Sequence, residues 1–448
     1  MEVKAFLKEN EENFDAIIEM QKLILNLDDS NFDDAISEFL DLDSKINIFL
    51  CSQQGMSTFL RTIKSALYAR PNQNEIHFRL LSEFNESIKF YFSSDELFSI
   101  FSDNFYVLRL FNFGLINMST ILKITEKELS RFIYFFPEIE KNEPEIFNKR
   151  LLLDNYVKNK INGINHETFL RNRLIGFNES ILAAAIRNDD SEEFQTILSQ
   201  TNTRIDSVLQ KSIFERCRFV NKGNISFIEY AAFWGSVNVF KYISMIQPKL
   251  PPKIIKFAIA GGNYNIIHLI ESQKGMVDGC LKASIAFHRN EIYDYFIENY
   301  FNTEKNGKNI ILVPNNNHRH HTQNALNNIN PNILNNLNNP NNLNNPNNLN
   351  NPNNFNNPNN LNNPNINHFN MNVNVNNINA NMNHINGNIP NANPVNIDHN
   401  LTFITELFLK SIIYYNYEIF FVICHMWILT RMILIVKLLY MLHLFMDI

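Results

Sequence analysis

Between about residues 178 and 300 the chain repeats a short pattern, and this repetition constrains its fold more than any other feature. Each copy has a short run of small residues, a tight polar turn around Gly or Asn, and a second run with bulky apolar residues. The two clearest copies, residues 230–243 and 257–270, align without a gap. A third copy follows at residues 283–296, and a weaker one precedes them at residues 184–190. The pattern predicts a series of helix–turn–helix units.

Such units are expected to stack, because no single one can bury its apolar face alone. Small alanine side chains on the inner helix let neighbouring units approach closely, and bulky residues on the outer helix fill the groove between helix pairs. Gly235 and Gly262 stand where the turn requires a positive φ angle, which costs glycine little. In the third copy His288 or Arg289 stands at that point and fits it less well.

This order of small residues, turn and bulky residues resembles the ankyrin repeat, and more specifically a divergent ankyrin-like domain family of protist proteins that has no assigned biochemical activity. The resemblance covers about residues 178–300, and in that family a helical region often precedes the repeats. The copies are shorter than the usual repeat of about 33 residues and lack its T-P-L-H signature, which puts the long β-hairpin fingers of ordinary ankyrin repeats in doubt. The resemblance implies an α-solenoid whose turns and inner helices bind another protein.

Residues 1–165 are expected to form an all-helical N-terminal region, followed by the repeat domain at residues 166–305. Apolar residues recur in the N-terminal region at intervals of three and four, the period of amphipathic helices, as in Ile17, Ile18, Met20, Leu23, Ile24 and Leu27. Pro71, Pro137 and Pro144 punctuate this pattern, and we expect about six to eight helices. The predicted fold class is therefore all-α, a helical N-terminal region followed by an ankyrin-like α-solenoid.

Residues 306–400 are predicted to be a disordered linker. From Asn338 to Asn365 the sequence Asn-Asn-Pro-Asn-Asn-Leu recurs with a period of six residues, and Phe355 replaces one Leu. The tract has almost no charge, and its regular prolines prevent a helix or a central strand. It cannot bury enough apolar surface to order itself.

The last segment, residues 401–448, begins as a further copy of the repeat. Residues 409–419 echo residues 281–292. Beyond about Ile419 the printed residues are apolar and irregular, but codons read one nucleotide earlier permit D-I-N-x-x-D-x-x-x-x-T-A-L-H-x-A-x-x-x-G, the spacing of the ankyrin consensus. We therefore predict a frameshift shortly after Ile419, in the gene, the assembly or the gene model.

The same tail supports a second hypothesis, in which residues 402–448 insert into a membrane as a hairpin or anchor. A membrane span needs about 18 or more consecutive apolar residues. The apolar run that starts at Ile419 ends at Thr430, and Arg431 and Lys437 interrupt the remainder. Membrane insertion is therefore the weaker interpretation.

Composition excludes several classes of function. The net charge is −6 and no long basic run is present, so the chain lacks the electrostatic footprint of a nucleic-acid binder. Its 4 cysteines are widely separated and include no CxxC pair, which argues against a disulfide framework or a zinc site and favours a reducing compartment. The charged, acidic start of the chain has no secretory signal pattern, so we expect a cytoplasmic location.

No residue pattern indicates a catalytic, cofactor or metal site. Ser-His-Asp, HExxH, GxGxxG and Walker-type spacings are absent from the sequence. Residues 29–33 open like a calcium loop, but Asp34 and Leu40 stand where that loop requires Gly and Glu. The histidine cluster at residues 318–321 has no fixed geometry around it. Cys217 has flanking arginines, which lower a thiol pKa, but no identifiable His partner, so we expect it to be a packing residue.

The candidate partner-binding residues of the repeats, all expected on the surface, are Phe233, Trp234, Lys241, His268, His288 and Arg289. Exposed tryptophan is typical of binding hot spots, so Trp234 either faces a partner from the concave rim or packs between repeats. The leading hypothesis is a non-enzymatic scaffold, without cofactors, that binds an unknown protein partner. The alternatives are a membrane-tethered adaptor anchored by residues 402–448, and the product of a broken ankyrin-repeat gene.

Overall fold

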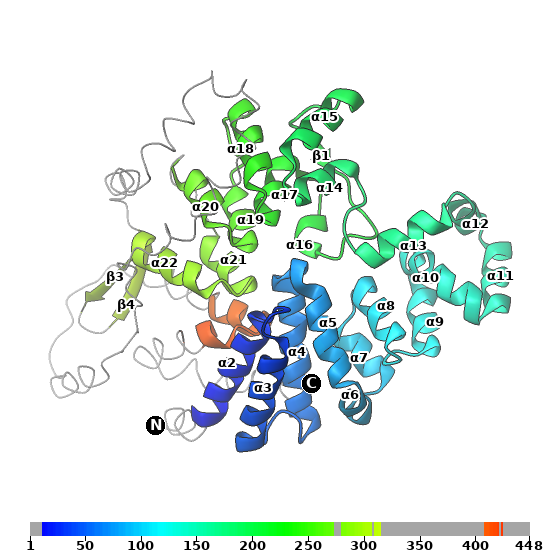
Figure 1. The fold of residues 1–448 in the computed structure, drawn as a ribbon, viewed down its shortest axis with the longest axis horizontal. Coiled ribbons are helices and arrows are strands. Elements are labelled where there is room, and N and C mark those ends of the chain that lie inside the picture. The colour runs from blue at the N-terminus through cyan, green and yellow to red at the C-terminus, as the bar shows by residue number, and fades with distance from the viewer. Residues whose placement is uncertain (1–10, 273–278, 307–308, 315–406, 421–422, 424–448) are drawn as a thin grey trace, which may run out of the picture. The chain divides into compact units, whose positions relative to one another are not determined.

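The computed structural model describes residues 11–272, 279–306, 309–314, 407–420 and 423. Within these residues the protein is all-α with two small two-stranded sheets (Figure 1), which confirms the predicted fold class. No helix in this part of the chain is long and apolar enough to cross a bilayer. The Asn-rich tract, the histidine cluster and the apolar tail after Ile423 lie outside the described residues.

Residues 11–175 form a run of mostly short helices. In chain order these are α2 (Glu11–Leu25), α3 (Phe32–Ile46), α4 (Gln53–Ala69), the 3-10 turn η1 (Pro71–Gln73), α5 (Asn74–Glu83), α6 (Asn85–Tyr91), α7 (Ser94–Ile100), α8 (Asn104–Asn112), α9 (Met118–Lys127), α10 (Leu129–Asn142), α11 (Pro144–Leu153), α12 (Asn155–Asn162) and α13 (His166–Ile175).

Several of these helices begin at side-chain caps. Ser93 and Glu96 form a capping box before α7, in which each side chain accepts a bond from the backbone N–H of the other residue. Asp103 accepts a bond from Phe105 N before α8. Each cap satisfies a backbone N–H that has no partner within the helix. The region therefore contains more helices than the six to eight or so that the periodicity predicted. Pro137, which was expected to mark a break, lies within α10.

Two hydrophobic cores underlie the fold. The N-terminal core draws mainly on residues 16–169 and is rich in phenylalanine. Phe59, for example, stacks on Phe39 with 5.0 Å between ring centroids and meets Phe84 edge-on at 5.1 Å. Such aromatic pairs contribute about 0.5–1.5 kcal/mol beyond the burial of their area. The second core begins at Leu182 and runs through the repeats.

From residue 181 onward the described chain contains five helix–turn–helix pairs, which we number in chain order. The first four pairs are α14 (Ile181–Arg187) with α15 (Ser191–Thr201), α17 (Phe227–Trp234) with α18 (Val237–Ile246), α19 (Ile254–Gly261) with α20 (Tyr264–Glu271), and α21 (Cys280–Ala286) with α22 (Asn290–Tyr300). The fifth pair, orange in Figure 1, has helical residues 407–413 and 417–420.

Short elements interrupt the series of pairs at two places. Between the first and second pairs lie β1 (Val208–Leu209), α16 (Arg218–Asn221) and β2 (Ile225–Ser226), and β1 pairs antiparallel with β2. After α22, β3 (Phe301–Asn306) pairs antiparallel with β4 (Asn309–Pro314). Strand β4 therefore lies within residues 306–400, which the sequence analysis predicted to be a disordered linker.

Each of the five turns contains one residue in the left-handed backbone region. These residues are Asp189 (φ 53°), Gly235 (φ 69°), Gly262 (φ 74°), His288 (φ 49°) and Tyr415 (φ 52°). The expectation of positive φ at the two glycines is confirmed. His288 adopts the same conformation, although a side chain is disfavoured there. The left-handed turn conformation therefore occurs in all five pairs, although the residue at that position is not the same in every pair.

The residue after the left-handed position links each later pair to the one before it. Its side chain donates a hydrogen bond to a backbone carbonyl of the preceding pair: Ser236 Oγ to Ile186 O at 2.5 Å, Asn263 Nδ2 to Gly235 O at 3.2 Å, Arg289 Nη2 to Gly261 O at 3.0 Å and Asn416 Nδ2 to Ile285 O at 3.2 Å. Serine, asparagine and arginine side chains thus donate to carbonyls at or just after the ends of inner helices, where the helix itself supplies no partner.

The inner helices pack against one another in the order α14, α17, α19 and α21, as Figure 1 shows. Apart from the partly exposed Ala184, their alanines are buried, as expected for small residues between stacked helices. The approach between α17 and α19 is especially close at Gly261, where a Cβ atom would lie 2.6 Å from both Ala232 O and Phe233 O.

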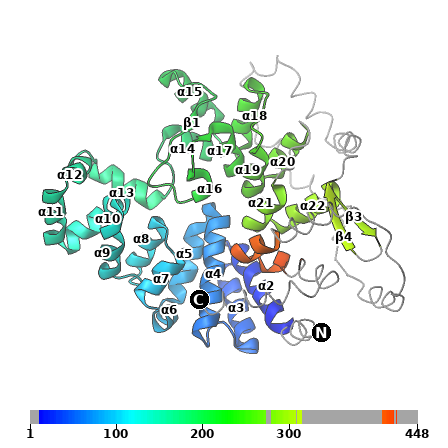
Figure 2. The same cartoon turned by 180° about the vertical axis from the view of Figure 1, so that it is seen from behind.

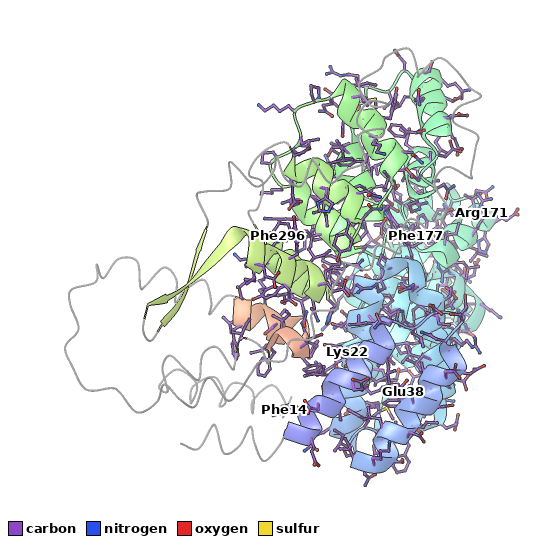
Figure 3. The ribbon with its side chains drawn as sticks, turned by 60° about the vertical axis from the view of Figure 1, so that its left-hand side comes forward. Phe14, Lys22, Glu38, Arg171, Phe177 and Phe296 are labelled. Atoms are coloured by element: carbon purple, nitrogen blue, oxygen red, sulfur yellow. The ribbon has the colours of Figure 1, made fainter. Side chains whose placement is uncertain are left out.

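The fifth pair packs beside the fourth, although residues 301–406 separate them in sequence. Its buried apolar residues belong to the same core as the first four pairs. N-terminal helices cover another side of it: Ser65 Oγ on α4 donates to Tyr414 O at 2.6 Å, and Gln21 Nε2 on α2 donates to Tyr415 O at 2.5 Å. Figure 3 shows the segment beside both α22 and α2. The Asn-rich tract is thus an insertion between two packed pairs.

Candidate functional site

A cavity of about 270 Å³ lies where the ends of inner helices meet the N-terminal region. The end of α4 and the turn η1 supply Arg70 and Gln73 to its wall, whereas the ends of α17 and α19 supply Trp234 and Gly261. Arg289, in the turn after α21, completes it. We call this cavity the arginine pocket. Figure 2 shows α4 approaching the helix pairs from the N-terminal region.

The two arginines donate hydrogen bonds to backbone carbonyls at the C-terminal ends of inner helices or directly after them. Arg70 Nη1 donates to Phe287 O at 2.8 Å, and its Nη2 donates to His288 O at 3.1 Å. Arg289 Nη2 donates to Gly261 O at 3.0 Å. A helix C-terminus carries partial negative charge, so a cation is favoured there. The arginines therefore tie the N-terminal region to the fourth pair, and the fourth pair to the third.

Both arginines stay protonated at neutral pH. Burial lowers the pKa of Arg70 to about 9, and repulsion from Arg289 is a smaller cause. Burial lowers the pKa of Arg289 to about 10, with Tyr264 and Glu291 acting in the opposite direction. No Asp or Glu of the described chain lines the pocket. Two positive charges thus share a carboxylate-free cavity.

Trp234 packs between elements, the second of the two roles considered for it. The side chain is half-buried, and its ring meets Phe177 edge-on with 4.7 Å between centroids; Phe177 is labelled in Figure 3. Phe233 is only 3% exposed because its ring lies 6.1 Å from Phe219 and 6.0 Å from Phe287. The expectation that Phe233 lies on the surface was therefore wrong.

His288 was also expected on the surface, and the structure corrects this too. Its side chain is 4% exposed, because α4 and the fifth pair cover it. The ring Nε2 lies 2.9 Å from Tyr414 O and 3.2 Å from Ser65 Oγ. Burial lowers the pKa of His288 to about 3, with repulsion from Arg70 as the next cause. The histidine is therefore neutral in the folded protein at neutral pH.

The buried state of His288 makes a prediction about acid stability. Between pH 7 and pH 5 the unfolded chain gains a proton at this histidine while the folded chain does not, so the folded state loses about 2 kcal/mol from this group. We expect His288→Asn, which tolerates the left-handed backbone, to lose less stability over that interval than the wild type. Denaturant unfolding at several pH values measures this. Parallel pH profiles of the two proteins would contradict the assignment.

The remaining candidates lie on or near outer helices. His268 on α20 is exposed, and its Nδ1 lies 2.9 Å from Glu271 Oε2. Lys241 on α18 is partly exposed. The structure therefore brings Phe233, Trp234 and Arg289 together at the arginine pocket and leaves His268 and Lys241 apart from it.

Sequence reasoning missed Arg70 and Gln73, which supply the N-terminal wall of the pocket. They flank Pro71 at the break between α4 and α5, and Pro71 was read only as punctuation. No repeat or motif includes them. Their role depends on contacts with residues more than two hundred positions away, such as the bond from Arg70 to Phe287, and these contacts leave no local pattern.

Two other features of the sequence are structural. Cys217 is buried, and burial raises the pKa of its thiol to about 12, so it is a packing residue as expected. At the calcium-like segment, Asp28 Oδ1 accepts bonds from Ser30 N at 2.8 Å and Asn31 N at 3.1 Å in the turn before α3. Among the described residues no three His, Cys, Asp or Glu side chains are grouped so that they could hold a metal ion.

The chain was compared with known proteins. Residues 246–319 match the family described as a domain of unknown function (DUF3447). This domain is found in ankyrin-repeat proteins. The matched segment includes the third and fourth pairs and Arg289 of the pocket. No curated protein and no solved structure matches the chain.

Proposed function

We propose that the protein is a non-enzymatic scaffold that binds a protein partner through stacked ankyrin-like helix pairs. The observation that carries this proposal is the repeated joint: each of five pairs has a left-handed turn residue, and the next side chain bonds each later pair to the one before it. Stacks of this kind present a continuous series of turns and helices, which is the surface that repeat proteins use for binding. The match to a domain of ankyrin-repeat proteins supports the same family.

The residues at the arginine pocket support binding rather than catalysis. Two arginines, a tryptophan and a glutamine supply charge, an aromatic face and hydrogen bonds. None of these groups is a ready nucleophile or general base at neutral pH. These groups favour an interaction protein over an enzyme. The scattered cysteines separately favour a reducing compartment such as the cytoplasm.

Negative charge added to the outer helices tests the proposal. We expect the double variant Lys241→Glu/His268→Glu in the full chain to lose partners that the wild type labels in a proximity-labelling experiment, because an unfavourable negative charge at a contact costs binding energy. Both side chains are exposed or partly exposed, so the fold is expected to remain intact.

The matched control is Lys149→Glu, an exposed residue on α11 in the N-terminal region. It replaces a lysine by glutamate, as at Lys241, but away from the repeats, and its labelled partners should equal those of the wild type. If the control and the double variant lose the same partners, or neither loses any, the outer helices of the repeats are not the binding surface.

A further inference from the structure

Aromatic rings gather on the inner side of the stack, where α4 and α16 approach α19 and α21. The ring centroid of Phe219 on α16 lies 4.9 Å from that of Phe257 on α19 and 5.0 Å from that of Phe287 after α21. Tyr68 on α4 stacks on Phe287 at 4.9 Å and on Tyr414 of the fifth pair at 6.1 Å. Figures 1 and 2 both show α4 and α16 beside these inner helices. All of these rings except Phe287 are partly exposed, so they form one aromatic surface.

The helices around these rings carry only positive charge. Helices α4, α16, α19 and α21 and the helical residues 407–413 contain no Asp or Glu, although the whole chain has 45 Asp and Glu residues against 39 Lys and Arg. The side chain of Lys256, next to Phe257, passes over Gly279 at the start of α21, and Lys410 Nζ lies 5.9 Å from the centroid of the Tyr414 ring. We call the inner basic face the partly exposed rings together with the cations of these helices, which are Arg61, Lys64, Arg218, Lys256, Lys282 and Lys410.

Lys64 is a half-buried cation that the fold leaves unpaired. Among the described residues no hydrogen bond or ion pair reaches its Nζ. Burial lowers the pKa of Lys64, and repulsion from Arg61 and then from Arg218 lowers it further. Lysine is rarely buried without a partner of opposite charge. The three cations therefore destabilise one another in the isolated chain, and an anionic group that binds beside them would relieve this repulsion.

The two arginines beside Lys64 are only partly neutralised. Arg61 donates from Nε to Ser57 Oγ at 3.1 Å and from Nη1 to Tyr415 OH at 2.5 Å, and both acceptors are uncharged. Arg218 is exposed, and its Nε lies 3.8 Å from Asp103 Oδ2. Within the described chain a single carboxylate therefore pairs with this group of three cations.

A short acidic segment of protein fits the inner basic face better than a nucleic acid does. The charges of a peptide respond mainly to cations within about 10 Å at about 0.1 M salt, whereas a long polyanion is also repelled by the net charge of −6 of the whole chain. Nucleic-acid bases bind by stacking on aromatic faces, and the ring of Tyr68 already stacks on Phe287 and Tyr414. Apolar side chains of a peptide pack against the ring edges that stay exposed.

We propose that the inner basic face binds an acidic segment of the protein partner, an inference that rests on the proposed scaffold function. Asp or Glu side chains of that segment pair with Lys64 and Lys256, and its apolar side chains pack on Phe219 and Phe257. Part of the affinity comes from the repulsion between cations that the segment removes, so binding weakens as the salt concentration rises.

Fluorescence anisotropy on the full chain tests the inner basic face with three labelled probes: a short peptide built from Glu, Leu and Gly, the same peptide with Gln in place of Glu, and a short oligothymidine. We expect the Glu peptide to bind about tenfold more tightly than the Gln peptide, because several ion pairs distinguish them. Equal affinity of the two peptides, or no binding of the Glu peptide, would overturn the proposal. Tighter binding of the oligothymidine than of the Glu peptide would overturn the assignment to a protein segment.

The double variant Lys64→Gln/Lys256→Gln locates the binding. It should weaken binding of the Glu peptide by about fivefold, since it removes two ion pairs. It also removes the repulsion of Lys64 from Arg61 and Arg218, so we expect it to unfold at the same denaturant concentration as the wild type or at a higher one. Unfolding at a lower concentration would show that the two lysines support the fold, and would overturn their assignment to binding.

The matched control is Lys141→Gln/Lys158→Gln. Both lysines are exposed in the N-terminal region, on α10 and α12, and the net charge changes by the same amount. The control should bind the Glu peptide as the wild type does. Equal weakening by the two double variants would show that only the net charge matters, and would overturn the location of the site.

The outcomes separate this inference from the scaffold function. Loss of labelled partners in Lys241→Glu/His268→Glu concerns the outer helices and does not depend on the inner basic face. If the Glu peptide binds through Lys64 and Lys256 while neither double variant of the repeats loses labelled partners, the face binds acidic peptides and the scaffold proposal fails. If the Glu peptide does not bind, this inference fails and the labelling result is unaffected.

Discussion

Replacing Gly261 by valine is expected to lower the free energy of unfolding by about 3 kcal/mol. Even the Cβ atom of the new side chain would lie 2.6 Å from two backbone oxygens of α17, those of Ala232 and Phe233. Backbone atoms cannot rotate away as a side chain does, so α17 and α19 would have to separate along the inner face of the stack. Denaturant unfolding of the full chain, with hydrogen exchange of α17 and α19, measures the effect.

Gly223→Val is the matched control for Gly261→Val. No atom lies within 4 Å of the position that a Cβ would occupy at Gly223, and its φ is not positive. We expect its stability to stay within about 0.5 kcal/mol of the wild type, as for other open surface sites. If the two variants unfold at the same denaturant concentration, close packing of the inner helices is not what Gly261 provides.

Replacing Asn416 by leucine should cost a similar amount, about 3 kcal/mol. Asn416 is fully buried. Its Nδ2 donates to Ile285 O at 3.2 Å and to Asn290 Oδ1 at 2.8 Å, and its Oδ1 accepts from Ile419 N at 3.2 Å. Leucine removes these three bonds and leaves Ile285 O, Asn290 Oδ1 and Ile419 N without the partner that Asn416 provides. We expect the fifth pair to detach first, seen as faster hydrogen exchange at residues 407–420 and at the facing part of α4.

The control for Asn416→Leu is the same chemical change at Asn142, an exposed residue at the end of α10 whose side chain donates to Glu138 O. It should leave exchange in the fifth pair unchanged and alter stability by no more than about 0.5 kcal/mol. Unchanged exchange at residues 407–420 in Asn416→Leu would mean that the fifth pair is held by its apolar contacts alone.

The repeats were the most predictable part of the fold, and the reason is local. In the second, third and fourth pairs the small residues, the turn and the bulky residues follow one another within a short stretch of sequence. The sequence alone therefore predicted stacked helix pairs. At Gly235 and Gly262 the residue type itself indicated the positive φ of the turn. At His288 and Tyr415 it did not, because neither residue favours that conformation; only the position in the repeat indicates it.

The candidate site was only partly predictable. Trp234 and Arg289 were selected as expected surface residues of the repeats, and they do line one pocket. Phe233 and His288 were also expected on the surface and are buried, because α4, α16 and the fifth pair cover the side on which they lie. Burial by elements distant in sequence has no local signature, and for this reason Arg70 was missed altogether. The frameshift after Ile419 stays a prediction, since the tail lies outside the described residues.

The contacts between α4 and the fifth pair have a consequence for synthesis of the chain. Ser65 and Tyr414, which share a hydrogen bond, are 349 residues apart in sequence. A ribosome adds about 5–20 residues per second, so the partner of Ser65 emerges roughly half a minute after Ser65 itself. Throughout that interval Ser65, Arg61 and Tyr68 of α4 lack the contacts that Tyr414 and Tyr415 give them in the folded protein. A premature stop before residue 407 would remove these contacts permanently.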